Sequence, residues 1–267
     1  MTKKFEKVFI TMILSLLLTG WSTAPNSSTG ETENAQAFAQ GESATFSPAF
    51  KTELPVDFTM YDYLVYVLND VHAYWSPLMT GDGYPAPEVT YSFPAAGEPI
   101  VTDCALPAPN DPLQAFYCGA DDQIVITQEM ALQIWNGALK TNLDPPIEYK
   151  AGDFSVAFVV AHEYAHNLQH ELGWLPVSGT AVPKTSSRSI ELNADCLTGI
   201  WASSVYARGL LETTDIQEVM RTLADIGEDS SNLNKTHGTP KERTDAFLLG
   251  YNSGFAPSCD PYLTTPQ

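Results

Sequence analysis

The stretch "DFSVAFVVAHEYAHNLQHEL", residues 153–172, predicts one helix with two very different halves. Residues 154–161 are apolar on almost every side, so this half is expected to lie buried in the middle of the fold, with Asp153 capping its start. The polar half begins abruptly and holds three of the chain's five histidines. A buried helix that suddenly presents clustered imidazoles indicates a metal site.

His162, Glu163 and His166 form the pattern H-E-x-x-H, which is typical of zinc peptidases. The two histidines are separated by about one helical turn, roughly 6 Å along the axis, so both rings can reach one ion. Glu163 is rotated by about 100° from His162. That position suits a base for a water activated by the metal. His170 lies a further turn on and is expected to be a polar residue at the helix end.

A catalytic zinc needs a third protein ligand and one open position. The longer pattern with a third histidine fails, because Gln169 and Leu172 occupy its later positions. A second helix, predicted at 187–211, carries Glu191 and Asp195 four residues apart on one face.

Spacing alone does not choose between these two carboxylates. Glu191 is longer and spans the gap between packed helices more easily, so it is assigned to zinc. Asp195 is then expected to accept the free N–H of a ligand histidine.

The chain's bulk properties limit its partners. Its 267 residues are 44% hydrophobic, which is enough for a proper core, and its net charge is −19. This charge argues against binding to nucleic acid or to anionic lipid, which both need a basic face. A soluble exported protein is the plainer interpretation of the acidity; attraction of cationic peptides is the alternative.

Residues 1–24 are predicted to be a signal peptide. Lysines precede a mostly apolar segment at 8–20 that is too short for a comfortable membrane span, and the small residues 22–24 suit cleavage. Trp21 stands where the lipidated cysteine of a lipoprotein would be, which favours plain secretion over anchoring. Residues 25–50 are polar and small and predict a disordered linker, followed by one domain over 51–267.

Four cysteines remain in that domain, an even number that suggests two disulfides in an exported chain. Three pairings are possible. Cys104 with Cys118 is the local choice, and Cys196 with Cys259 would then tie the C-terminal tail to a helix. A cysteine zinc site is the weaker alternative, because no C-x-x-C pair exists.

The remaining elements are predicted as scaffold, and together they indicate a mainly α fold with a small β element. The sequence predicts a strand at 122–127 and helices at 56–79, 127–139 and 213–229, with a fourth helix inside 236–251 that starts at Pro240. Thr214 with Gln217, and Thr239 with Glu242, have the spacing of capping boxes. In the first helix, His72 and Trp75 are interpreted as packing residues.

Four segments in this order resemble the neutral zinc metallopeptidase family of bacteria: "AFYCGADDQIVI", "HEYAHNLQ", "ELNADCLTGIW" and "THGTPKERTDAFLLGY". The resemblance implies a helix-rich, zincin-like α+β domain with an active-site helix and a glutamate helix, one zinc ion, and peptidase activity. It also implies an aspartate four residues after the glutamate ligand, which Asp195 matches. Since zincins bind peptides along an edge strand, residues 123–127 are the expected substrate strand. Gly119, Ala165 and Asn167 depart from the family's usual residues without removing a ligand.

These observations favour a secreted zinc endopeptidase that acts on a peptide or protein. Zinc would be held by His162, His166 and Glu191, with Glu163 as general base for the activated water. His237, just before the last of these helices, is the candidate donor to the oxyanion. Two alternatives stay open: a zinc amidase acting on cell-wall or other non-protein amides, and a catalytically idle binding module. A serine hydrolase is disfavoured because no G-x-S-x-G pattern occurs.

Overall fold

The computed structural model describes residues 54–55, 57–104, 111–137, 152–175, 187–212, 214–227 and 237–264. All of them belong to one compact unit, Gln40–Gln267. The predicted signal peptide at 1–24 and linker at 25–50 lie outside the described residues.

The helices are α1 Met60–Gly81, α2 Gln128–Trp135, α3 Asp153–Glu171, α4 Ser187–Ala207, α5 Asp215–Ile226, α6 Pro240–Ser253 and α7 Pro261–Thr264, with a 3-10 turn η1 at Ala256–Cys259. The strands are β1 Thr90–Ser92, β2 Ala115–Cys118 and β3 Gln123–Ile126. This confirms a mainly α fold with a small β element.

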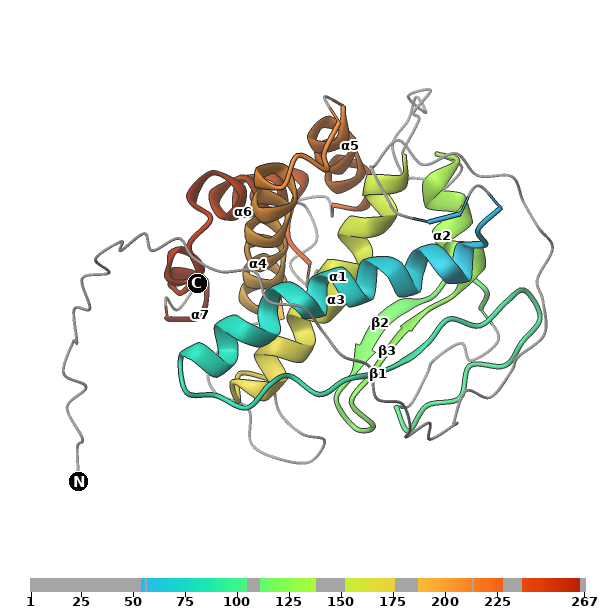
Figure 1. Cartoon of the computed structure of the whole chain (residues 1–267), viewed down its shortest axis with the longest axis horizontal. Helices are drawn as coiled ribbons and strands as arrows, with labels where there is room; N and C mark the ends of the chain where they lie inside the picture. Colours follow the sequence, from blue (N-terminus) through green and yellow to red (C-terminus); the bar gives the residue numbers. More distant parts are fainter. Residues whose placement is uncertain are drawn as a thin grey trace, which may run out of the picture. The chain divides into compact units, whose positions relative to one another are not determined.

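Helix α3 is the central element of the domain. It packs against α1, α2, α4, α5 and strands β2 and β3, and Figure 1 shows it behind α1, between the sheet and α4. Every residue from Asp153 to Gln169 is buried, the polar ones included. The prediction that this helix lies in the middle of the fold is therefore confirmed, and burial extends through the polar half as well.

The helix starts show which local signals the fold uses. Helix α1 begins at Met60, after a capping box formed by Thr59 and Asp62, rather than at the predicted residue 56. Helix α6 begins as predicted, with a capping box between Thr239 and Glu242. Its proline at the first position fits because the missing N–H would have no partner there.

Two predicted caps were wrong. Gly152, not Asp153, is the N-cap residue of α3, and no side chain caps that helix. Thr214 has helical backbone angles and makes no capping hydrogen bond, so its predicted box with Gln217 does not form. Here Asp215 accepts a hydrogen bond from the backbone N–H of Glu212 at 2.6 Å.

The three strands are ordered β1-β3-β2, so β3 lies in the centre of the sheet. Strand β1 pairs with β3 in parallel, whereas β2 pairs with β3 antiparallel, with Phe116 opposite Val125. The expectation that residues 123–127 form the open edge was wrong, because both sides of β3 are occupied. Strand β2 has a partner on one side only within the described part of the sheet.

Helices α4 and α6 approach each other unusually closely through two glycines. A Cβ atom added at Gly250 would lie 1.9 Å from the carbonyl oxygen of Cys196, and one at Gly199 would lie 2.0 Å from that of Phe247. Any side chain at either position would collide with backbone. This contact brings the first turn of α6, which carries Arg243, against α4.

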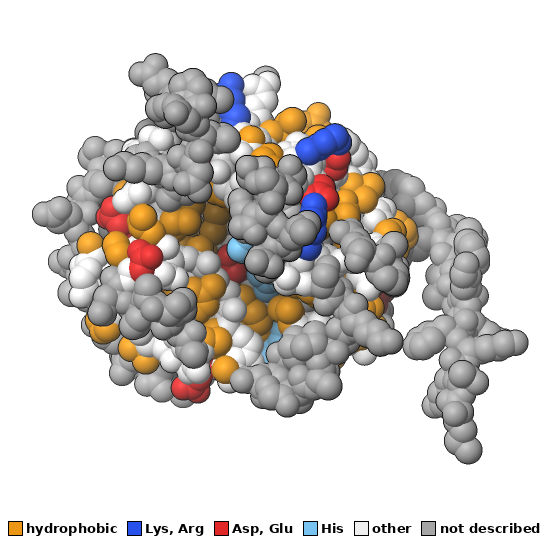
Figure 2. All heavy atoms as spheres, turned by 180° about the vertical axis from the view of Figure 1, so that it is seen from behind, with side chains coloured by type: hydrophobic (Ala, Val, Ile, Leu, Met, Phe, Trp, Pro, Cys, Tyr) orange, Lys and Arg blue, Asp and Glu red, His pale blue; other side chains and the backbone are white. Residues whose placement is uncertain are grey.

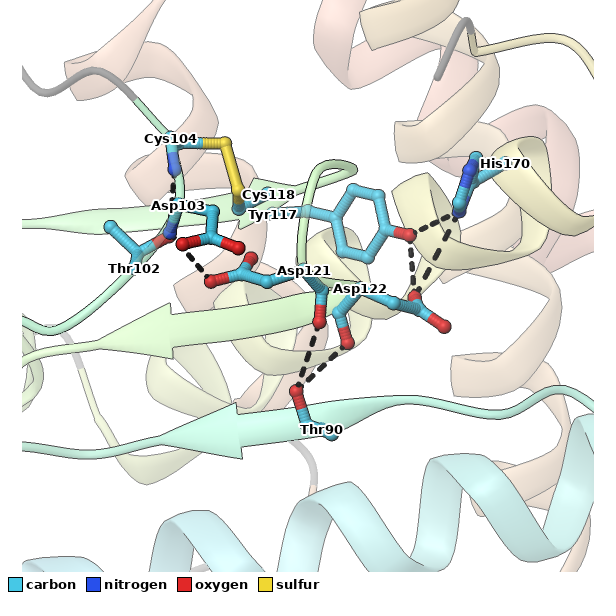
Figure 3. The surroundings of a disulfide bond; sticks show 9 residues. All are labelled: Thr90, Thr102, Asp103, Cys104, Tyr117, Cys118, Asp121, Asp122 and His170. Atoms are coloured by element: carbon cyan, nitrogen blue, oxygen red, sulfur yellow. Dashed lines mark hydrogen bonds and ion pairs between the residues drawn. A yellow bond between two sulfur atoms is a disulfide. The ribbon is translucent and has the colours of Figure 1, made fainter. Parts of the chain in front are cut away.

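Both expected disulfides are present, Cys104–Cys118 and Cys196–Cys259, with sequence separations of 14 and 63. The first joins the end of β2 to the segment before it (Figure 3). The second ties η1 to α4. No helix among the described residues is long and apolar enough to span a membrane.

Three carboxyl groups, from Asp153, Asp215 and Glu218, lie together at the start of α3 and α5, with oxygens within 4.8 Å of one another. Burial, followed by the charges of Asp153 and Asp215, raises the pKa of Glu218 to about 7. The same carboxylate occupies the space that a side chain at position 152 would need, which explains Gly152.

Removing either disulfide as a pair of alanines should destabilise the domain. In the chain-entropy account the 63-residue separation corresponds to about 4 kcal/mol and the 14-residue separation to about 3 kcal/mol. Urea unfolding of Cys196→Ala/Cys259→Ala and Cys104→Ala/Cys118→Ala would measure both losses. Unchanged midpoints would show that the bridges add nothing.

Glu218→Gln should stabilise the domain at pH 8 and have little effect near pH 4.5. Because the folded-state pKa of about 7 exceeds the ordinary 4.5, the folded protein binds more protons between these values, and its stability falls as pH rises. After allowance for partial exposure, the variant should gain about 1 kcal/mol at pH 8, or about 2–4 °C in Tm. Equal gains at both pH values would contradict this explanation.

Candidate metal centre

Helices α3 and α4 bring two imidazoles and a carboxylate together. His162 Nε2 lies 3.1 Å from Glu191 Oε2, and His166 Nε2 lies 3.6 Å from the same oxygen. One ligand atom from each of the three residues lies within 4.8 Å of the others. The three residues predicted as ligands from the sequence are therefore neighbours, and their Nε2 and carboxylate atoms converge on one point.

The other nitrogen of His162 faces a buried acid. His162 Nδ1 lies 2.9 Å from Asp195 Oδ1, although the N–H direction is not aligned for a regular hydrogen bond. Asp195 is completely buried, and Arg243 donates to both of its oxygens at 2.8 Å. Asp195 thus lies beside a histidine of the candidate site, as the sequence predicts. Its other partner, Arg243, was not predicted from the sequence.

A signal for Arg243 was available in the sequence. On α6, residues 243, 246, 247 and 250 are all buried, which is the spacing of one helix face. Arg243 is therefore the first member of an otherwise apolar stripe, and it is 3% exposed. A buried guanidinium requires a carboxylate partner, and Asp195 supplies it.

His166 is held by an amide. Its Nδ1 lies 2.8 Å from Gln169 Oε1, and Gln169 Nε2 donates to the Ile190 carbonyl and to Asn193 Oδ1 at 2.8 Å each. Because both amide protons of Gln169 have acceptors, its oxygen faces His166, whose Nδ1 must carry the proton. This tautomer leaves the lone pair of Nε2 facing Glu191. In the sequence, Gln169 shows only that a third histidine ligand is missing from this helix.

The charges around this point favour a bound cation. Burial alone would raise the pKa of Glu191, but His166 and His162 outweigh it and hold that pKa well below its usual range. Burial would lower the pKa of His162, yet Asp195 and Glu191 raise it to about 10. The carboxylates thus attract positive charge to this point, and two imidazole nitrogens with one carboxylate oxygen form a donor set that zinc accepts.

Glu163 stands beside the three donors and is 7% exposed. Burial raises the pKa of its carboxyl, while His162 and His166 oppose that rise. A carboxyl group with an elevated pKa is suited to accept and release a proton near neutral pH.

These residues open into a cavity of about 350 Å³. In Figure 2 pale-blue histidine atoms lie recessed among apolar side chains in the centre of the face. His237 lines the cavity from the segment before α6, and Arg243 lines it from α6 itself. The remaining lining comes from β2, α3, α4 and α5: Ala115, Phe116, Tyr117, Phe158, Val159, His162, Glu163, His166, Glu191 and Ile226.

Two histidines and a glutamate from adjacent helices, with a second glutamate beside them, form a donor set that could hold a metal ion, as in zincin-type peptidases. The chain matches the family described as "Putative neutral zinc metallopeptidase" over residues 100–262, and it belongs to that family.

Among its relatives, the uncharacterized protein YpfJ of Escherichia coli K12 is 31% identical over 55% of this chain and 53% of its own length. The uncharacterized proteins Mb2605 of Mycobacterium bovis and Rv2575 of Mycobacterium tuberculosis are each 28% identical over 73% of this chain and 68% of their own. The chain thus spans about half the length of YpfJ. No solved structure matches it.

Substitution of Glu191 and of Asp195 should affect zinc binding to different degrees. Glu191→Ala removes a donor and should lose most of the zinc, whereas Asp195→Ala should weaken binding by about 10–100-fold. Chelator-competition titration measures both. Asp70→Asn breaks a different acid–arginine pair, with Arg208, and should leave the affinity unchanged. The reverse ranking of the first two variants would exchange their roles.

Proposed function

We propose that this protein is a secreted, zinc-dependent endopeptidase. The observation that carries the proposal is the position of β2, Ala115–Cys118. Three of its residues line the same cavity as Glu163 and the three metal donors. Among the described residues its outer side has no partner strand, and an extended peptide would pair there through the backbone N–H and C=O groups of β2.

His162, His166 and Glu191, which line the cavity, would hold the zinc ion. When bound, zinc supplies a Lewis acid that polarises the scissile carbonyl and makes water a stronger acid. Asp195, fixed by Arg243, lies 2.9 Å from Nδ1 of His162, and Gln169 accepts from Nδ1 of His166, so that Nε2 of each imidazole faces this point. Preorganised ligands lower the cost of gathering the site.

Glu163 would remove the proton from the attacking water and deliver it to the leaving amine. Its buried position beside the donors and its raised pKa support this role. His237, on the cavity wall, would donate a hydrogen bond to the oxygen that becomes negative during attack. Phe158 and Val159 form an apolar wall one turn before the histidine pair, which favours substrates with an apolar side chain next to the scissile bond.

Export is part of the proposal. Two disulfides are typical of proteins that fold in an oxidising compartment. The net charge of −19 and the apolar segment near the N-terminus agree with it. Mass analysis of the protein recovered from the culture medium would show whether residues 1–24 have been removed; recovery only from the cytoplasm would contradict export.

Glu163→Gln should abolish peptide hydrolysis while leaving zinc bound, because the base is lost and the donors are intact. A loss of about 10²–10⁴-fold in kcat is expected. The measurement is turnover of a fluorescence-quenched peptide library, with zinc content determined on the same samples. Near-normal activity in the variant would show that Glu163 is not the base.

The choice of substrates separates the proposal from its alternatives. Cell-wall fragments and non-peptide amides should be poorer substrates of the wild-type protein, since they offer fewer regularly spaced backbone groups to an edge strand. Preferential cleavage of cell-wall fragments would identify an amidase instead. A zinc-loaded protein that cleaves nothing in either set would be an idle binding module.

A further inference from the structure

Strand β2 is useful to a substrate only if it is held at the correct distance from the metal donors. A displacement of about 1 Å between a bound substrate and the catalytic groups can cost about 10²-fold in rate. The backbone ladder ties β2 to β3, but the donors His162 and His166 belong to α3. Contacts between β2 and α3 therefore set this distance.

A polar cluster makes that connection. The hydroxyl of Tyr117, on β2, lies 2.6 Å from His170 Nδ1 and 2.6 Å from Asp122 Oδ1. Asn167 Nδ2 donates to the same Asp122 oxygen at 2.9 Å and to the carbonyl of Glu88 at 2.9 Å. Figure 3 shows the Tyr117 ring reaching from its strand to His170, with Asp122 next to both.

Asn167 and His170 follow His166 by one and four residues on α3, so the helix that carries the two histidine donors also anchors the strand. Asp122 has a positive φ of 50°, a conformation uncommon for a residue with a side chain. In that turn between β2 and β3, its carboxylate is directed back toward Tyr117 rather than outward.

The protons in this cluster can be placed. Tyr117 has one hydroxyl proton and two close partners, and a carboxylate can only accept. The hydroxyl must therefore donate to Asp122 and accept from His170 Nδ1–H. Each contact then has one donor and one acceptor. His170 is fixed in its Nδ1–H tautomer, so it does more than end the helix in a polar residue.

We propose that Tyr117, held by His170 and Asp122, is a positioning residue that fixes the substrate strand relative to the metal-ligand helix. This inference rests on the proposed peptidase function. Its consequence is specific. Long peptides pair with β2 along several residues, so they depend on its placement, whereas short peptides held mainly at the metal depend on it less.

Tyr117→Phe keeps the ring and removes both hydrogen bonds. The measurement is kcat/KM of the zinc-loaded protein for a quenched octapeptide and for a tripeptide with the same scissile bond. The octapeptide-to-tripeptide ratio should fall by about tenfold or more. Zinc affinity, from chelator competition, should stay within about twofold. Tyr91→Phe, on the opposite edge strand β1, is the matched control and should preserve the ratio.

A second pair of variants tests the histidine. His170→Asn places an amide N–H close to the position of Nδ1 and should keep most of the preference for the octapeptide, whereas His170→Ala should lose it. Nitrogen NMR of the histidine rings gives a readout without substrate: the wild-type protein should show His170 as Nδ1–H, and Tyr117→Phe should release that tautomer.

An unchanged octapeptide-to-tripeptide ratio in Tyr117→Phe would overturn the inference, even with a lower Tm, because the hydroxyl would then serve stability alone. A wild-type His170 protonated only on Nε2 would overturn it as well. A wild-type protein that cleaves neither peptide, with the NMR result as expected, would instead refute the proposed function.

Discussion

A single buried carboxylate, Asp195, joins the two helices that carry the candidate metal donors to a third helix, α6. It is fully excluded from solvent on α4, receives two hydrogen bonds from Arg243 of α6, and contacts His162 of α3. An isolated charge would not be tolerated at this depth, so the guanidinium and the carboxylate require each other. The candidate metal donors are arranged around this pair, since Nδ1 of His162 contacts Asp195 and Glu191 lies one turn earlier on the same helix.

The sequence predicted which three side chains converge because their spacing is local. The spacing of His162 and His166 on one helix places both rings on one face whatever the rest of the chain does. The pairing of Glu191 with them needed only the existence of a second helix, since the longer side chain reaches across. The disulfide pairing was also accessible, because two of its four cysteines flank one short loop.

The sequence failed where a property depends on a partner elsewhere in the chain. Strand β1 has three residues with no buried alternation, so neither it nor the strand order could be read, and β3 was mistaken for an edge. The caps at Asp153 and Thr214 satisfied local rules, but both sites adjoin the buried carboxyl cluster, where other contacts decide the backbone. Arg243 gave a signal, a charge in an apolar stripe, that became meaningful only when Asp195 was placed opposite it.

The Cys196–Cys259 bridge begins at the residue after Asp195, and the ring that it closes encloses all of α6 together with Arg243 and His237. In the oxidised chain, then, Arg243 cannot diffuse far from Asp195 even when every helix has melted. The covalent ring raises the local concentration of the guanidinium around its carboxylate, because the disulfide has already removed much of the chain entropy that closing this loop would cost. In an oxidised denatured chain, Arg243 and Asp195 therefore stay near each other. In a reduced chain the two residues have to meet by diffusion of a longer loop.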